Sequence, residues 1–164
     1  MSGLHELEYA DMEYEVEMFD PTPPPAGAVL LTRFAFASST LTATHRRIIA
    51  KIAADMLARV ASWPDWPPLC PVVEISGHED EPGDPANYGA FGLRRATAVA
   101  RALGALFEEG MKRLPATVRL PQGIEIQVSS EGPERPIRSN LTADGRAMNR
   151  RVEVLVHLNP CPTA

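Results

Sequence analysis

Apolar positions along the chain follow two periods, alternate residues and the helical repeat, which predicts strands interleaved with helices. Residues 44–62 and 90–109 carry apolar side chains at helical spacing, and the second run stops at Gly110, a residue typical of helix C-caps. Apolar runs at residues 28–36, 72–76, 124–128 and 152–158 predict strands, and a polar loop covers residues 131–149. The predicted order β-α-β-α-β-β indicates an α/β (α+β) sheet with helices packed on one face.

The N-terminal segment has a different pattern. Residues 11–18 alternate acidic and apolar side chains, which predicts a strand with one carboxylate face and one apolar face that adds to a sheet edge or pairs with a neighbour. Residues 21–25, Pro-Thr-Pro-Pro-Pro, form a stiff extended linker. We therefore expect an acidic arm and linker over residues 1–27 and a folded domain over residues 28–160.

The charge and the apolar content of the chain limit which classes of binding partner fit it. The chain has 164 residues and a net charge of −5, which argues against nucleic acid. Residues 1–20 hold seven of the 21 acids and no Lys or Arg, so 14 acids face 16 basic residues in the remainder. No apolar stretch is long enough for a membrane span, and residues 1–20 do not have the basic and apolar regions of a signal peptide. The simplest interpretation of the arm is a solvated segment.

Two clusters of residues carry candidate chemistry. The first is Gly77-His78-Glu79-Asp80, followed by Gly83, Asn87-Tyr88 and Arg94-Arg95-Ala96. The second is the run from Asn140 to Val152, Asn-Leu-Thr-Ala-Asp-Gly-Arg-Ala-Met-Asn-Arg-Arg-Val. Asp80 ends a predicted strand, and that edge is where α/β sheets place ligands. Arg95 lies four residues before an apolar position of the next helix and leans toward the sheet, whereas Arg94 points to water.

The two clusters together resemble the OmpA-like domains. Members of that family carry a Gly-His-Thr-Asp strand end, a Gly three residues later and an Arg-Ala pair in the next helix, and they close with Asn-x-Thr-x-x-Gly-Arg-x-x-Asn-Arg-Arg-Val. The second cluster matches throughout, and Phe34-Ala35-Phe36 fits the family's Phe-x-Phe entry. The spacing of fifteen residues from Asp80 to Arg95 also agrees. The resemblance covers about residues 28–158 and implies the family's two-layer sandwich with a mixed sheet.

The resemblance implies non-catalytic binding of peptidoglycan through diaminopimelate, which would anchor a cell-envelope component to the cell wall. Diaminopimelate presents an ammonium and a carboxylate on one carbon, so its receptor needs an anion close to a fork-shaped cation. Asp80 and Arg95 fit these two roles. The resemblance adds Arg150 as a second cation and Asn149 as the residue that holds the loop. The expected ligand-binding set is Asp80, Arg95, Arg150, Asn87, Tyr88 and Asn149.

This chain departs from the family pattern at three positions. Glu79 stands where Thr is usual, and Tyr88 stands at the usual helix-entry Asn, with Asn87 one place earlier. Ala37 replaces a polar residue, often Asp or Asn. The family uses two of these positions to complete the ligand's hydrogen bonds. A second interpretation therefore stays open, in which the fold serves protein–protein interaction and residues 1–20 dock on an envelope protein or on a second copy.

Other classes of function have less support. No second His or Cys has the spacing of a metal ligand, and no nucleophile stands beside a base, so we expect no enzyme, cofactor or metal. Cys70 and Cys161 either form a disulfide, if their strands are antiparallel neighbours, or remain two free thiols. The resemblance places the protein in the cell envelope, on the periplasmic side of the outer membrane if it is exported.

Overall fold

The structure is a computed structural model that describes residues 19–163. The predicted strand at residues 11–18 lies outside this range, and the predicted boundary at residue 27 stays a prediction. Among the described residues, no helix has the length and apolar character needed to cross a membrane. The elements in chain order are β1 (Val29–Leu31), α1 (Ala43–Ala61), β2 (Leu69–His78), a 3₁₀ turn (Pro85–Asn87), α2 (Ala90–Met111), β3 (Glu125–Gly132), α3 (Ala143–Asn149) and β4 (Val152–Pro160).

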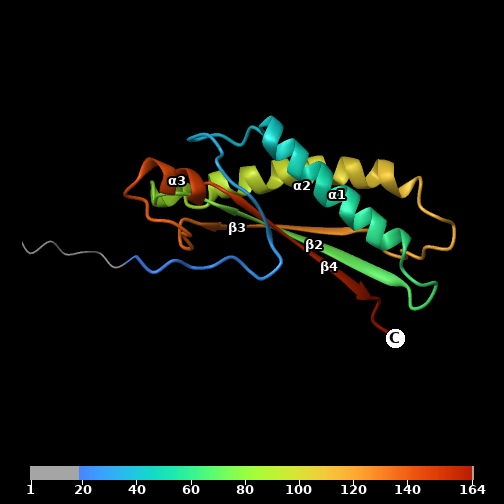
Figure 1. Ribbon diagram of the computed structural model, residues 1–164. Coiled ribbons are helices and arrows are strands. Elements are labelled where there is room, and N and C mark those ends of the chain that lie inside the picture. The colour runs from blue at the N-terminus through green and yellow to red at the C-terminus, as the bar shows by residue number, and fades with distance from the viewer. Residues whose placement is uncertain (1–18, 164) are drawn as a thin grey trace, which may run out of the picture.

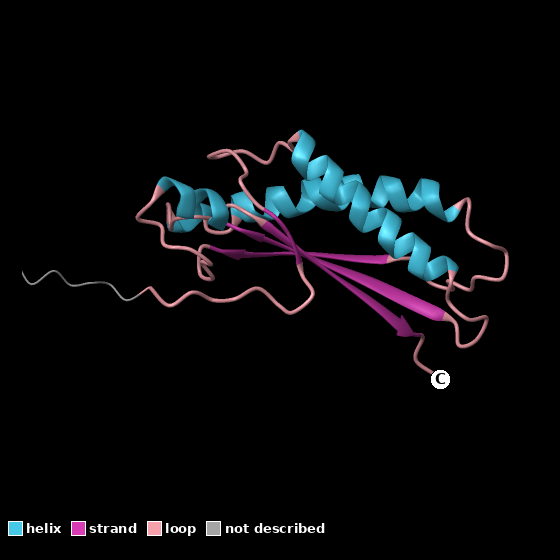
Figure 2. Ribbon diagram, viewed as in Figure 1, coloured by secondary structure: helices cyan, strands magenta, loops and turns pink. Residues whose placement is uncertain are grey.

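The strands form one mixed sheet in the order β1-β4-β2-β3. β2 and β3 are parallel, whereas β4 runs antiparallel to both β1 and β2. Helices α1 and α2 lie together over one face of the sheet (Figure 1), and the other face carries no helix among the described residues (Figure 2). The predicted mixed sheet with helices on one face is confirmed.

The hydrophobic core lies between the two long helices and the covered face of the sheet. The apolar stripes of α1 and α2 meet inward-facing residues of the central strands β2 and β4. Thr42 begins α1 with reciprocal hydrogen bonds, accepting from the backbone N–H of His45 while the His45 ring accepts from the backbone N–H of Thr42. The buried core residues of these elements include Ile49, Ile52, Met56, Val73, Ile75, Val99, Leu103, Phe107, Val152 and Val154.

The first strand is shorter than predicted. The apolar run at residues 28–36 predicted one long buried strand, but β1 ends at Leu31. Arg33 and Ala37 have φ angles of +63° and +50°, and these left-handed conformations turn the chain out of the sheet. Phe34 is fully buried as a result, while Phe36 is 80% exposed. The prediction of a buried strand that continues to Phe36 is therefore wrong.

Two further details differ from the sequence-based expectations. Gly110 was expected to cap α2 but lies inside the helix, where a Cβ would stand 2.1 Å from a methyl carbon of Leu57. Its role is the close approach of α1 and α2. The expected polar loop at residues 131–149 also contains α3, a helix of 7 residues that begins at Thr142. The hydroxyl of Thr142 accepts from the backbone N–H of Gly145.

Cys70 and Cys161 form a disulfide. Cys70 lies in β2 opposite Asn159 of the antiparallel strand β4, and Cys161 follows two residues later. The two strands are therefore antiparallel neighbours, as a disulfide requires. Of the two alternatives left open by the sequence, a disulfide or two free thiols, the structure has the disulfide. It fastens the C-terminal end of β4 to the start of β2.

Candidate functional site

The C-terminal end of β2 and the first turn of α2 approach so closely that only glycine fits. A Cβ on Gly77 would lie 1.7 Å from the carbonyl oxygen of Gly92, and a Cβ on Gly92 would lie 2.9 Å from the carbonyl oxygen of Gly77. Contact between two backbones leaves no flexible side chain that can move aside. This packing brings the residues that follow β2, including Asp80, beside the start of α2.

Glu79 caps the N-terminus of α2 from a distance in sequence. Its carboxylate accepts hydrogen bonds from the backbone N–H groups of Phe91 at 2.9 Å, Gly92 at 3.0 Å and Gly89 at 3.3 Å. These N–H groups have no partner within the helix, and the positive end of the helix dipole favours an anion there. Sequence analysis recorded Glu79 only as a departure from the family pattern. The chain thus supplies its own carboxylate at a helix end suited to bind an external anion.

A pocket of about 290 Å³ opens between the loop after β2 and the start of α2. It brings together four of the six predicted ligand-binding residues, and Phe36 and Tyr88 are its most exposed aromatic walls, at 80% and 45%. Sequence analysis missed Phe36, because the left-handed backbone that exposes it leaves no periodic signal. The lining residues are Phe36, Ala37, Glu79, Asp80, Glu81, Pro82, Gly83, Asp84, Asn87, Tyr88, Phe91 and Arg95.

Arg95 forms the inner wall of the pocket and is only 1% exposed. Its guanidinium donates to the carbonyls of Ser38 at 2.9 Å, His78 at 3.1 Å and Ala35 at 3.4 Å. Burial lowers the pKa of Arg95 from its usual value, and the neighbouring carboxylates of Asp80 and Glu79 oppose this effect. Arg94 is exposed, as its helical position predicted. Of the five guanidinium N–H groups of Arg95, two remain outside these three hydrogen bonds.

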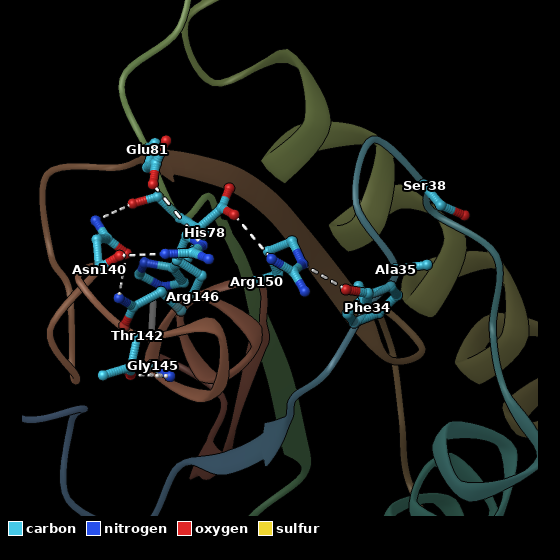
Figure 3. A network of polar contacts seen from close by, with 12 residues as sticks. Phe34, Ala35, Ser38, His78, Glu81, Asn140, Thr142, Gly145, Arg146 and Arg150 are labelled. Atoms are coloured by element: carbon cyan, nitrogen blue, oxygen red, sulfur yellow. Dashed lines mark hydrogen bonds and ion pairs between the residues drawn. The ribbon is translucent and has the colours of Figure 1, made fainter.

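Arg150 forms an ion pair with Asp80. Arg150 Nη1 donates to Asp80 Oδ2 at 2.8 Å, and Arg150 Nε donates to the carbonyl of Phe34 at 2.6 Å. Figure 3 shows Arg150 between the loop after β2 and the segment of Phe34 and Ala35. The side chains of Arg150 and Asp80 are 15% and 13% exposed. Arg150 is therefore committed to Asp80 and does not line the pocket.

Asn149 has no exposed surface and holds the loop before α3. Its side-chain oxygen accepts from the backbone N–H groups of Ile137 at 2.9 Å and Arg138 at 3.1 Å, and its amide donates to the carbonyl of Arg138 at 2.7 Å. The expected role in holding the loop fits this geometry, whereas direct contact with a ligand does not, because every polar atom of the side chain is buried and bonded within the protein.

The same loop fixes the backbone of Asp80. The side-chain amide of Asn140 donates to the carbonyl of Asp80, and Arg146 donates to the carbonyl of Asn140 at 2.7 Å. Figure 3 shows Asn140 and Arg146 gathered beside Glu81 at this point. The second sequence cluster therefore shapes the site by holding Asp80 in position, which the resemblance alone did not indicate.

The charges of the pocket suit a ligand with an ammonium group. Four carboxylates line it, those of Glu79, Asp80, Glu81 and Asp84, and Arg95 is its only lining cation. Glu79 is occupied by the helix end and Asp80 is half-buried, whereas Glu81 and Asp84 are exposed. Within residues 19–163 no three His, Cys, Asp or Glu side chains are grouped to hold a metal ion. The arrangement can bind a cationic or zwitterionic group by charge and hydrogen bonds.

Similar folds occur in solved structures of low sequence identity. The peptidoglycan-associated lipoprotein from Burkholderia pseudomallei is 22% identical with a TM-score of 0.55, covering 77% of this chain and 88% of that chain. The C-terminal domain of Helicobacter pylori MotB is 19% identical with a TM-score of 0.54, covering 80% and 85%. The cell wall anchor of the T6SS from Pseudomonas aeruginosa is 24% identical with a TM-score of 0.51, covering 80% of each chain. These likenesses show the fold.

The family itself follows from the sequence. No curated protein matches this chain. The sequence pattern of the OmpA family matches residues 33–150, which is more than half of the chain and includes the first cluster, the second cluster as far as Arg150, and the loop of Phe36 and Ala37. The pocket, the capped start of α2 and the loop that supports Asp80 all lie inside the matched range. The chain belongs to the OmpA family.

Proposed function

We propose that this domain binds peptidoglycan without catalysis and anchors a component of the cell envelope to the cell wall. The observation that carries the proposal is one pocket that both the carboxylate of Asp80 and the guanidinium of Arg95 line. Membership of the OmpA family supports it. Two of the similar solved structures are, by their names, a peptidoglycan-associated lipoprotein and a cell wall anchor, which supports it further.

The proposed ligand group is the zwitterionic end of diaminopimelate. The ammonium sits against Asp80, whose Oδ2 is taken by Arg150 while Oδ1 faces the ligand. The carboxylate turns to the inner wall, where Arg95 keeps a fixed positive charge and two N–H groups beyond its three backbone contacts. Tyr88 and Phe36 cover the apolar stem of the ligand, since both are exposed at the opening.

The expected affinity for a single site is modest. Exposed ion pairs contribute about 0–1 kcal/mol each, and Glu79 already occupies the N-terminus of α2, which removes one source of anion binding. A polymer that offers many identical stems compensates through avidity. This suits an anchor, which must hold a continuous wall rather than capture a scarce small molecule.

The disulfide supports an extracytoplasmic location. Such bonds persist in oxidising compartments such as the periplasm and are rare in the cytosol. Cys70 and Cys161 are bonded, and no other cysteine is present in the chain. We therefore place the domain on the periplasmic side of the envelope.

A pull-down with purified sacculi tests the proposal. Asp80→Asn keeps the shape of the side chain and removes its charge, so we expect the variant to lose most of its sedimentation with sacculi. Asp144→Asn is the matched control, because Asp144 is an exposed acid outside the pocket, paired with Arg33. Arg95 is a less clean target, since its replacement also removes three hydrogen bonds to the backbone. Equal sedimentation of both variants and the unmodified protein contradicts the assignment.

A further inference from the structure

A groove that shares no lining residue with the pocket has no role in the proposed function. It has a volume of about 590 Å³ and lies between one flank of α1 and the edge formed by β1 and β4. Residues of α1 from Thr44 to Arg59 line one wall of the groove. They follow one another at alternating intervals of three residues and one residue, so they form a continuous stripe along the helix. Figure 1 shows α1 lying obliquely across this side of the sheet.

The groove lies under α1 where the edge strand β1 pairs with only the first part of β4. β1 pairs only with Val152, Glu153 and Val154 of β4, while β4 continues to Pro160. Within residues 19–163 no strand pairs with the outer side of β4 beyond Val154. An open edge of this kind offers unpaired main-chain donors and acceptors to an extended segment. The groove borders this open edge, because Val156, in the part of β4 that β1 does not pair, is one of its lining residues.

The lining of the groove is apolar inside and basic at its rim. Ile48, Ile52, Met56, Val154 and Val156 form the interior. Arg47, Lys51 and Arg59 stand along the rim with one acid, Asp55, which pairs with Lys51 at 2.8 Å. The rim therefore has an excess of positive charge. An occupant that fits has apolar side chains on one face and carboxylates on the other.

The acidic arm of this chain has that pattern. In residues 11–18, Met12, Tyr14, Val16 and Met18 alternate with Asp11, Glu13, Glu15 and Glu17. With the apolar face turned into the groove, the acids stand at its mouth beside the basic rim. The lengths agree as well: eight extended residues span about 26 Å, and the helical stripe from Thr44 to Arg59 spans about 22 Å.

The position of the linker favours the arm of another molecule. The N–H of Thr22 donates to the carbonyl of Pro136, in the loop before α3, and Pro25 borders the uncovered face of the sheet. The groove opens on the other, helix-covered side of β1. Figure 1 shows the described chain starting on the side where α3 lies. The prolines at positions 21, 23, 24 and 25 favour an extended linker over one that folds back on the domain.

We infer that the groove between α1 and β4 binds residues 11–18 of a second copy of this chain, so that two molecules exchange their acidic arms. The exchange is reciprocal, as a twofold dimer requires, and each arm adds a strand beside the open edge of β4. The wall-binding pocket takes no part in this contact. The dimer thus presents two pockets to one polymer.

Reversing the charges of the acidic arm, of the basic rim of the groove, or of both tests the inference on the full chain. Light scattering coupled to size-exclusion chromatography should give twice the mass of one chain for the unmodified protein. The triple variant Glu13→Lys, Glu15→Lys, Glu17→Lys should give a monomer, and so should Arg47→Glu, Lys51→Glu, Arg59→Glu. A protein that carries all six changes should recover the dimer, because the opposite charges are again paired.

The matched control reverses three exposed arginines that do not line the groove, Arg101, Arg113 and Arg119, and it should stay dimeric. The arm variant changes no residue of the core, so its result stands even if the rim variant folds poorly. A monomeric unmodified chain overturns the inference, whether or not its own arm occupies the groove. A dimer that survives the arm variant or the rim variant, or that the six changes fail to restore, overturns it as well.

Discussion

Ala37 stands at the edge of the pocket in a conformation that suits a different residue. Its φ angle is +50°, in the left-handed region, and it lines the pocket beside Phe36. Alanine is disfavoured there by steric contact of its Cβ, whereas Asn and Asp tolerate the region because their side chains bond to nearby backbone. The family resemblance gives Asp or Asn as the usual residue here, and either would suit this left-handed backbone better than alanine.

Ala37→Asn should stabilise the domain and strengthen wall binding. Relief of the left-handed strain is expected to add about 0.5–1 kcal/mol to the free energy of unfolding, and the amide adds a polar group to the pocket. Urea denaturation and sedimentation with sacculi measure the two effects. Ala37→Gly is the control, since it relieves the strain without adding a polar group. An unchanged or lower stability of both variants would contradict the argument.

Helical periodicity was enough to distinguish Arg95 from Arg94, because the repeat of a regular helix alone determines which side chains point toward the sheet and which point to water. It was not enough to place Phe36 or Glu79. Phe36 faces the pocket because Arg33 and Ala37, before and after it in the chain, have positive φ, and Glu79 caps a helix that begins eleven residues further along the chain. Neither arrangement leaves a signal in a single sequence, since the conformations depend on tertiary packing. The ligand contacts of Asp80 and Arg95 stay a prediction.

At the scale of elements, the contact between β2 and α2 sets the geometry of the pocket. Gly77 and Gly92 bring the two backbones together, so the loop after β2 and the start of α2, which both line the pocket, lie side by side. The crossing of α1 and α2 at Gly110 is also close, but a Cβ added at Gly110 would meet the end of the Leu57 side chain. A flexible methyl group can move, whereas a backbone carbonyl cannot do so without shifting its helix.

Gly77→Ala should therefore be far more harmful than Gly110→Ala. The first is expected to lower the free energy of unfolding by about 2–3 kcal/mol, since it overpacks a rigid contact. The second should stay within about 1 kcal/mol of the unmodified protein, because better helix propensity offsets the displacement of Leu57. Urea midpoints with unchanged slopes measure both values. Equal losses in the two variants would mean that the β2–α2 contact is looser than described.

The long elements were predictable from the sequence and the short ones were not. The two long helices and the central strands showed clear periods over many residues, and they occur where expected within a few residues. β1 has 3 residues and α3 has 7, which is too short for a period to be recognised. Their boundaries are set by turns and caps, at Arg33 and Thr142, whose effect depends on the surrounding fold.

At the scale of the whole molecule, a buried ion cluster joins the start of β4 to the loop before α3. Arg151 donates to Glu153 at 2.7 Å and 2.9 Å and to the carbonyl of Arg135 at 3.0 Å, and His78 lies 3.5 Å from the same carboxylate. Burial by itself would raise the pKa of Glu153, but the hydrogen bonds and charges of His78 and Arg151 outweigh it and lower that pKa.

This cluster makes the stability of the domain depend on pH in the acid range. The folded pKa of Glu153 lies below its usual value of 4.5, so its contribution is complete above about pH 4.5 and is lost as the pH falls through the folded value. Glu153→Gln should therefore show a shallower decline of the free energy of unfolding below about pH 4.5. At neutral pH the variant should be less stable by about 3–5 kcal/mol, because Arg151 stays buried without a counter-ion. Parallel pH profiles of variant and unmodified protein would contradict this.

The overall architecture and the family were accessible from sequence, because the two motif clusters and the order of elements each constrain the whole chain. The disulfide was accessible only as one of two alternatives, since it requires β2 and β4 to be antiparallel neighbours. The groove beside α1 was not predictable, because it lies where β1 begins only at Val29, opposite Val154 of β4, and the start of so short a strand leaves no signal in the sequence.

A calorimetric titration with two stem peptides that differ at one carbon tests the central claim most directly. One peptide carries diaminopimelate and the other carries lysine, which keeps the ammonium and has no carboxylate beside it. If Asp80 and Arg95 bind the zwitterion together, the diaminopimelate peptide should bind at least about tenfold more tightly, which corresponds to about 1.4 kcal/mol. Asp80→Asn should abolish the difference. Equal affinities for the two peptides in the unmodified protein would contradict the account.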